Sequence, residues 1–309
     1  MSSSEYAFIR YSCASELRRQ TASRVLIVAI VLCFIHGVQT YAQTQASCTF
    51  NIFKLNDLQT TVFGVNDYGT VVGEADFTSP TPEKGFIRYS GGGVSYYSAP
   101  NSAGTRFTGR NDSGINIGVY SSQNAITIAK GFMLSGSTFT SIVHPNAVWG
   151  TTLTGINKYN SIVGWYLDTN ENPHGFKRYN DGSFRTLQFN SGTIDTIPNG
   201  INDYGTIVGW FNTQHGFIFH NNSWALLDYP NSSATELKGI SNSGLIVGLN
   251  HATQQGISFL YANGTFKTIN IPNSFLTNVA SISPNGLIAG TANMTGDQTG
   301  WRGFTATCH

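Results

Sequence analysis

Short apolar stretches that alternate with polar turn residues recur from residue 50 onward. The segment GVNDYGTVVG begins at Gly64. Related segments follow at intervals of 39 to 46 residues, a period typical of propeller repeats. The pattern therefore predicts six imperfect repeats, whose core segments begin at Gly64, Gly109, Gly155, Gly200, Gly239 and Ser281.

Each repeat corresponds to four short strands. The first ends in Gly-Ile-Asn, the second contains Ile-Val-Gly, the third begins with Gly-Phe, and the fourth ends near Pro-Asn, as in SWALLDYPN. We expect the aromatic residues of the Gly-Phe strands to form the core between blades. Asn202-Asp203-Tyr204-Gly205 has the composition of a tight turn, and Asn263-Gly264 is a hairpin signal. Four antiparallel strands in about 43 residues are the size of one blade. We expect an all-β, six-bladed β-propeller of four-stranded blades that forms a single domain over residues 46–309.

The two ends of the repeat region complement each other. The sixth repeat stops at His309 without a fourth strand, whereas CTFNIFKLND near the start resembles a fourth strand with no preceding repeat. Alignment of the ends places Cys308 and Cys48 where the fourth repeat has Asn221 and Asn222 in its last hairpin turn. We therefore expect the N-terminal strand to complete the C-terminal blade, with a Cys48–Cys308 disulfide in place of the missing turn. A sandwich or a solenoid does not explain this exchange of strands.

Residues 1–45 have the pattern of a signal peptide and leader. Arg18, Arg19 and Arg24 precede an apolar run over residues 25–35, which is shorter than the roughly 20 residues of a membrane span. Small residues follow, and they predict cleavage after Ala42 or after Ala46. We expect a secreted or periplasmic protein with no membrane span after cleavage. An uncleaved anchor and lipidation at Cys48 are the alternatives.

Charge and motifs narrow the functions that the chain can have. After residue 45 it carries 13 Lys and Arg against 14 Asp and Glu, so we expect no nucleic-acid partner. It contains no phosphate loop, GxSxG or HExxH motif, and its histidines have no short metal-ligand spacing. The repeated Asn and Asp of the first turns lack the clustered carboxylates of a calcium loop, so we interpret them as turn caps. We predict no catalytic motif, metal or cofactor.

Loop length and aromatic residues indicate where a ligand would bind. In an up-and-down blade, the second-to-third and fourth-to-first connections emerge on one face, and here these are the long, variable ones. We call this the loop face and the opposite one the turn face. Exposed aromatic rings beside amides and carboxylates suit sugar recognition. The predicted ligand-binding residues of the loop face are Trp149, Tyr166, Asp168, Trp210 and Trp301, with Tyr229 nearby. For Trp165 and Trp210, packing between blades is the alternative.

The repeat core resembles a known family. His174-Gly175-Phe176 and His215-Gly216-Phe217, together with the Gly-Ile-Asn-x-x-Gly-x-Ile-Val-Gly core, resemble the bacterial extracellular HAF repeats, named for a His-Ala-Phe element. The resemblance covers nearly all of residues 50–304. The other repeats lack the histidine, so a ring of functional histidines is not indicated. The resemblance implies an exported propeller-like protein and supplies no catalytic residues.

Three kinds of function fit these observations. The first, which we predict, is a monomeric, non-catalytic propeller that binds glycans or another extracellular polymer. The second is a polysaccharide hydrolase or lyase whose acids come from several blades, and the third is a structural module that contacts other exported proteins. Fold alone does not choose among them. The acids available to an enzyme include Glu74, Asp76, Asp168, Glu171 and Asp297.

Overall fold

The computed structural model describes residues 44–55, 59–76, 82–122, 125–190, 195–251, 256–295 and 301–309. The described residues belong to one compact unit, residues 41–309. The predicted signal peptide, with Ala42, lies outside the described residues. Among the residues that are described, no helix is long and apolar enough to cross a membrane.

Regular structure in the described ranges consists of β-strands, which follow the repeats of the sequence. Repeats one to three form β3 (Gln59–Val65), β4 (Val71–Asp76), β5 (Lys84–Arg88), β6 (Val94–Tyr97), β7 (Ser102–Arg110), β8 (Asn116–Ser122), β9 (Ala125–Ser135), β10 (Thr138–Ile142), β11 (Gly150–Ile156), β12 (Ile162–Leu167), β13 (Pro173–Arg178) and β14 (Phe184–Leu187). Repeats four to six form β15 (Thr196–Ile201), β16 (Ile207–Phe211), β17 (His215–His220), β18 (Ser223–Leu226), β19 (Thr235–Ile240), β20 (Ile246–Asn250), β21 (Ile257–Ala262), β22 (Thr265–Thr268), β23 (Ser274–Ile282), β24 (Ile288–Met294) and β25 (Trp301–Cys308). Two strands precede them, β1 (Thr44–Gln45) and β2 (Cys48–Phe53).

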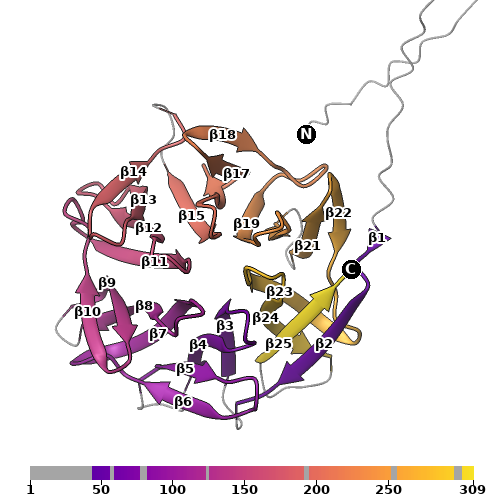
Figure 1. Cartoon of the computed structure of the whole chain (residues 1–309), viewed down its shortest axis with the longest axis horizontal. Helices are drawn as coiled ribbons and strands as arrows, with labels where there is room; N and C mark the ends of the chain where they lie inside the picture. Colours follow the sequence, from indigo (N-terminus) through magenta and orange to yellow (C-terminus); the bar gives the residue numbers. More distant parts are fainter. Residues whose placement is uncertain are drawn as a thin grey trace, which may run out of the picture. The chain divides into compact units, whose positions relative to one another are not determined.

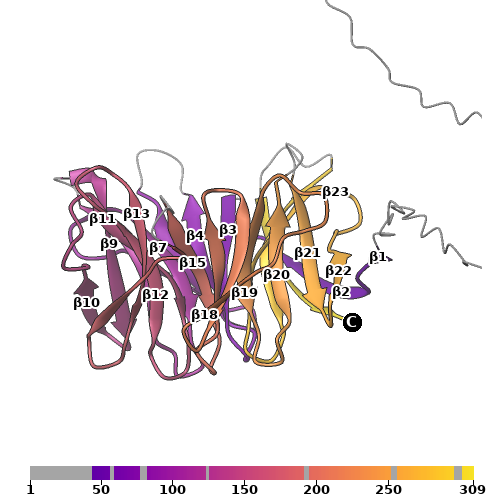
Figure 2. The ribbon, with the colours of Figure 1, turned by 90° about the horizontal axis from the view of Figure 1, so that it is seen from above.

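The strands form a β-propeller, with sheets arranged around a central channel (Figure 1). Seen from the side, the strands run between the two faces of the ring (Figure 2). The described strands pair into five sheets: three of four strands, one of five that includes β1, and one of eight that spans β7 to β14. The all-β propeller is as predicted. Six separate four-stranded sheets are not observed, because a single parallel pair, Gly150 with Ala129, joins the meanders of repeats two and three.

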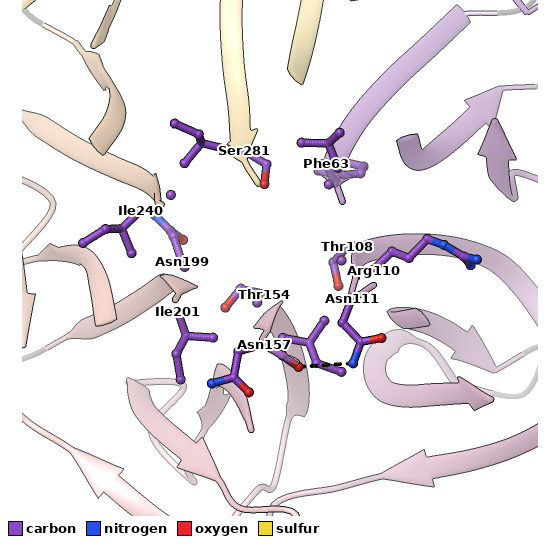
Figure 3. A pocket seen from close by; sticks show the side chains of 18 of the residues that line it. Phe63, Thr108, Arg110, Asn111, Thr154, Asn157, Asn199, Ile201, Ile240 and Ser281 are labelled. Atoms are coloured by element: carbon purple, nitrogen blue, oxygen red, sulfur yellow. Dashed lines mark hydrogen bonds between the residues drawn. The ribbon is translucent and has the colours of Figure 1, made fainter. Parts of the chain in front are cut away.

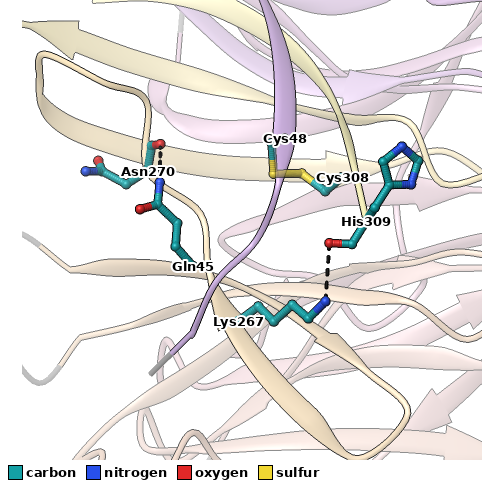
Figure 4. The surroundings of a disulfide bond; sticks show 6 residues. All are labelled: Gln45, Cys48, Lys267, Asn270, Cys308 and His309. Carbon is teal, nitrogen blue, oxygen red and sulfur yellow. Dashed lines mark hydrogen bonds between the residues drawn. A yellow bond between two sulfur atoms is a disulfide. The ribbon is translucent and has the colours of Figure 1, made fainter. Parts of the chain in front are cut away.

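Closure of the ring agrees with the prediction from the two chain ends. β2 pairs antiparallel with β25, with Cys48 opposite Cys308, and a disulfide joins the two residues (Figure 4). The His309 amide donates to the Ser47 carbonyl at 2.9 Å, so the bond lies where other repeats have the third-to-fourth-strand turn. The disulfide is therefore a staple on the turn face.

The segment before Cys48 adds a second link between repeats. β1 pairs in parallel with β22 of repeat five, and the Ala46 amide donates to the Thr268 carbonyl at 2.9 Å. Ala46 is buried in a cluster formed by repeats five and six. Gln45 also donates through its side chain to the Asn270 carbonyl at 3.3 Å (Figure 4). Residues 44–46 thus belong to the folded unit.

The core explains why glycine and phenylalanine recur together. Phe217 of β17 lies directly opposite Gly209 of β16, and a Cβ atom on Gly209 would lie 2.9 Å from the ring of Phe217. The ring therefore occupies the space above the glycine. The expectation that these aromatic residues form the core is confirmed, since all six are fully buried: Phe86, Phe132, Phe176, Phe217, Phe259 and Phe304.

The first turn of each repeat also links neighbouring repeats. Asn202 caps its own turn, because its Oδ1 accepts from the Thr206 amide at 2.9 Å, as we predicted. Its Nδ2 donates to the Ser241 carbonyl of the next repeat at 3.1 Å. Asn66, Asn111 and Asn157 make the same kind of bond to the repeat that follows. The Asn285 amide donates to Asp67 Oδ1 at 2.8 Å, which joins repeat six to repeat one.

We predict that the disulfide contributes a large part of the global stability. Replacing Cys48 and Cys308 together by Ser should lower the free energy of unfolding by about 3 to 5 kcal/mol, because the closed loop spans most of the chain. The measurement is guanidinium unfolding of both proteins. Reduced wild type should unfold at the same midpoint as the variant, and an unchanged midpoint after confirmed reduction would contradict the prediction.

Candidate functional site

A β-bulge at the same place in every repeat builds the wall of the central channel. The register between the first and second strands shifts by one residue just before the repeated glycine, for example between Leu237 and Gly239. A bulge leaves one residue unpaired and redirects its side chain. The unpaired residues of repeats one to six are Phe63, Thr108, Thr154, Asn199, Lys238 and Ala280.

These six bulge residues form what we call the bulge ring. All six line one pocket in the channel, and Figure 3 shows several of their side chains around it. Their neighbours along each strand serve packing, whereas the bulge residue differs in size and chemistry from repeat to repeat. Lys238 is the one charged member of the ring. The ring is thus a chemically varied part of the channel wall.

Lys238 belongs to a polar cluster centred on the buried carboxylate of Glu236. Its Nζ donates to Glu236 Oε1 at 2.7 Å, and Asn199 Nδ2 donates to the same oxygen at 3.0 Å. His251 Nε2 lies 3.1 Å from Glu236 Oε2. Burial alone would raise the pKa of Glu236, but the charge of Lys238 and the hydrogen bonds from His251 and Lys238 hold that pKa at about 2. Glu236 therefore stays ionised and holds Lys238 in place.

A second pocket opens beside the ring and contains one of the predicted aromatic residues. Trp301, at the start of β25, lines it together with Lys238 and Phe63 of the bulge ring. Its polar walls come from Thr61, Asn278 and Thr291, and it holds about 690 Å³, open solvent included. We call it the mouth pocket. It combines a half-buried indole with an ammonium, an amide and two hydroxyl groups.

Trp210 reaches the same cluster from repeat four. Its ring centroid lies 6.3 Å from that of His251, which in turn contacts Glu236. Trp210 is half-buried, and its ring lies beside His251 of repeat five. This agrees in part with the alternative that Trp210 packs between repeats. The predicted residues Trp210 and Trp301 thus border a common cluster centred on Lys238.

The other predicted residues lie in repeat three. Asp168 accepts from the amides of Asn170 and Asn172 and lies 2.9 Å from His174 Nε2. The hydrogen bond from His174 lowers the pKa of Asp168 to about 2, although burial opposes it. Trp149 is 42% exposed and donates to the Thr169 carbonyl at 3.4 Å. Trp149 therefore remains available to a ligand, whereas Asp168 mainly organises its own loop.

Two aromatic residues that we expected on the surface are buried. Tyr166 is only 6% exposed, because its ring stacks on His144 at a centroid distance of 3.9 Å. Burial, and to a smaller extent the charge of His174, lowers the pKa of His144 to about 4. Tyr229 is 3% exposed and packs against Phe259. The prediction of Tyr166 as a ligand-binding residue is not supported, since its ring is covered by its own neighbours.

The most exposed tyrosines lie instead on the turn face. Tyr68, Tyr159 and Tyr204 occupy equivalent positions in the first turns of repeats one, three and four, and Tyr204 is 70% exposed. Sequence reasoning did not single out this group, nor Asn199, Glu236 and Lys238. The signal for Lys238 was present, since the residue before the repeated glycine varies among otherwise similar segments.

Glu74 lines a pocket on the loop face, separate from the channel pocket and the mouth pocket, together with Glu83 and Arg106. Burial raises the pKa of Glu74 to about 7, Arg106 opposes the rise, and the carboxylates of Glu83 and Asp76 add to it. Asp297, another acid of the enzyme hypothesis, lies outside the described residues. Within the described part of the chain, no group of three or more His, Cys, Asp or Glu could hold a metal ion.

Comparison with known proteins supports the fold class and no particular identity. No family model and no curated protein matches the sequence. Among solved structures, TolB from Acinetobacter baumannii is 15% identical with a TM-score of 0.51, and the alignment covers 78% of this chain and 65% of TolB. The chain thus spans less than two thirds of TolB.

Two further structures align over most of their length. An Aleuria aurantia lectin in complex with Fucα1-6GlcNAc is 12% identical with a TM-score of 0.48, over 82% of this chain and 96% of the lectin. The β-propeller domain of the Trilobed protease from Pyrococcus furiosus is 8% identical with a TM-score of 0.47, over 81% of this chain and 97% of that domain. At such identities the likeness concerns the fold alone.

The raised pKa of Glu74 predicts a pH-dependent stability. The folded state favours the protonated form of Glu74. The free energy of unfolding is therefore highest below pH 4.5, and this stability is lost as the pH rises through about 7. Glu74→Gln should therefore be more stable than wild type at pH 8.5, by up to about 3 kcal/mol, and equal to it near pH 4.5. Urea unfolding at several pH values measures this. Glu171→Gln, in an exposed loop, is the control, and a constant difference across pH would contradict the prediction.

Proposed function

We propose that this protein is a non-catalytic extracellular binding propeller whose ligand is a glycan held in the mouth pocket. The observation that carries the proposal is the composition of that pocket, which places Trp301 beside Lys238, Asn278 and Thr61. An indole packs well against the apolar face of a pyranose, while amide, ammonium and hydroxyl groups bond sugar hydroxyls.

The setting of these groups supports recognition of a specific ligand. Trp301, Asn278 and Lys238 all lie within strands, β25, β23 and β19, so the sheets fix their positions. Groups on rigid elements lose little freedom when a ligand binds. Trp210 and His251 would extend the surface for a longer chain.

We further propose that the ring counts six blades and that the chain is a HAF-repeat protein. One residue pair joins repeats two and three, whereas each repeat has its own bulge and its own four-stranded meander. His174-Gly175-Phe176 and His215-Gly216-Phe217 support the family proposal. The eight-stranded sheet then counts as two blades.

For export, we predict that cleavage takes place after Ala42 rather than after Ala46. Ala46 is 6% exposed and its amide bonds Thr268, so cleavage at the later site would remove a buried part of the fold. Mass spectrometry of the N-terminal peptide from exported protein should therefore find a chain that begins at Gln43. A chain that begins at Ser47 would contradict the prediction.

Glycan binding itself is tested with a glycan array and titration calorimetry on the purified protein. We expect Trp301→Ala to weaken binding of any glycan found on the array at least about tenfold, because the stacking platform is lost. Tyr204→Ala is the matched control, since it removes an exposed aromatic ring from the turn face. Equal losses of affinity in both variants, or a loss only in Tyr204→Ala, would exclude the mouth pocket as the glycan-binding site.

An enzyme is the second candidate, favoured by one observation. Glu74, whose pKa burial raises to about 7, shares a pocket with the carboxyl group of Glu83, and glycosidic chemistry uses two carboxyl groups, one of which has a raised pKa when it acts as the acid. A reducing-sugar assay on the ligands from the array separates the two functions. Turnover that Glu74→Gln abolishes would establish the enzyme, while binding without turnover supports the binding propeller.

A further inference from the structure

We infer that the ligand of the mouth pocket is an acidic glycan built of uronate units, and that Lys238 and Thr108 bind its carboxylates in the central channel. This inference rests on the proposed glycan-binding function and adds the chemical class of the ligand. It is supported by two members of the bulge ring that have hydrogen-bond donors without an acceptor among the described residues.

Lys238 has hydrogen-bond donors to spare. An ammonium group has three N–H donors, and Glu236 accepts one of them. The side chain is 26% exposed and lines both the channel pocket and the mouth pocket. The ion pair with Glu236 holds the ammonium group in place, and two further N–H donors remain for a ligand.

The partner of Lys238 does not itself face the ligand. Glu236 is only 8% exposed, and its oxygens are occupied by Lys238, Asn199 and His251. The six residues of the bulge ring include one cation and no carboxylate. The charge that the bulge ring offers to a ligand is thus positive, which favours an anion over a neutral hydroxyl.

Thr108 provides an independent observation. Its Oγ1 is buried and has no hydrogen-bond partner in the described part of the chain, although the residue lines the channel pocket. Thr154 holds the same place in the next repeat, and its Oγ1 donates to the Pro198 carbonyl at 2.7 Å. A buried hydroxyl without a partner is unfavourable and rare, so an acceptor on a ligand would satisfy it.

The sugar and the acid are expected on one molecule because the two kinds of group share a pocket. Trp301 and Lys238 both line the mouth pocket, and Lys238 and Thr108 both line the channel pocket. A uronate offers a pyranose face for Trp301 and a ring carboxylate for Lys238. A neutral sugar would leave the ammonium and the Thr108 hydroxyl with weaker acceptors.

The test compares an oligogalacturonate with its methyl ester by titration calorimetry, since the two differ in charge but share the sugar ring. Wild type should bind the acid at least about tenfold more tightly than the ester. Raising the salt concentration should weaken only the binding of the acid. Thr108→Val should weaken binding of the acid about threefold or more and leave the affinity for the ester nearly unchanged.

The variants of Lys238 are designed around its buried partner. Lys238→Gln should reduce the preference for the acid to about twofold or less, but it leaves Glu236 buried without its ion pair, which can unfold the protein. The double variant Glu236→Gln with Lys238→Gln removes both charges and should show the same loss of preference. Lys267→Gln is the control, because this lysine lies on the outer strand β22 and bonds the His309 carbonyl. The preference of Lys267→Gln for the acid over the ester should equal that of wild type.

The outcomes separate this inference from the proposal on which it rests. Equal affinity of wild type for acid and ester, or a preference that survives in the folded double variant, would overturn the inference. In that case the proposed function would still be supported if wild type binds both forms and Trp301→Ala weakens the binding of both. If neither form binds, the inference is overturned, and a silent glycan array would overturn the proposed function as well.

Discussion

The close approach of the innermost strands around the channel is the constraint on which the rest of the structure depends. A Cβ atom on Gly200 would lie 2.9 Å from the Cα of Gly239, and one on Gly64 would lie 3.0 Å from the Cα of Gly109. Side chains cannot fit there, so each first strand needs a small residue at this point. The bulge before the glycine then turns one side chain toward the axis, and the Asn after it caps the turn and bonds the next repeat.

This constraint explains which parts of the fold the sequence could predict. The glycine, the Asn of the first turn and the buried phenylalanine recur because they meet the same packing demand in every repeat, and repetition makes them visible. Closure was predictable for a similar reason, since Cys308 and Cys48 fill the place that Asn221 and Asn222 have in the fourth repeat. The predicted core, turn caps and disulfide are therefore all observed.

Other features depend on register and on local partners, which the repeat pattern does not contain. Lys238 could be placed on a first strand, but its projection into the channel follows from a one-residue shift in pairing with β20. Tyr166 is buried because His144, from the connection that precedes β11, stacks on its ring. The pair Gly150 and Ala129, which merges two meanders, likewise involves neither a repeated motif nor a turn.

The ion pair of Glu236 and Lys238 is difficult to explain by stability. Replacing a buried ion pair by well-packed apolar residues is often neutral or stabilising, because both charges must be withdrawn from water. The propeller itself shows that the fold does not need this pair: repeat four has Ile197 where repeat five has Glu236, and repeat six has Ala280 where repeat five has Lys238. Packing thus leaves these positions free to vary. A cation held at one point of the ring fits our proposal that a ligand enters the channel and binds at its wall rather than in the loops above it.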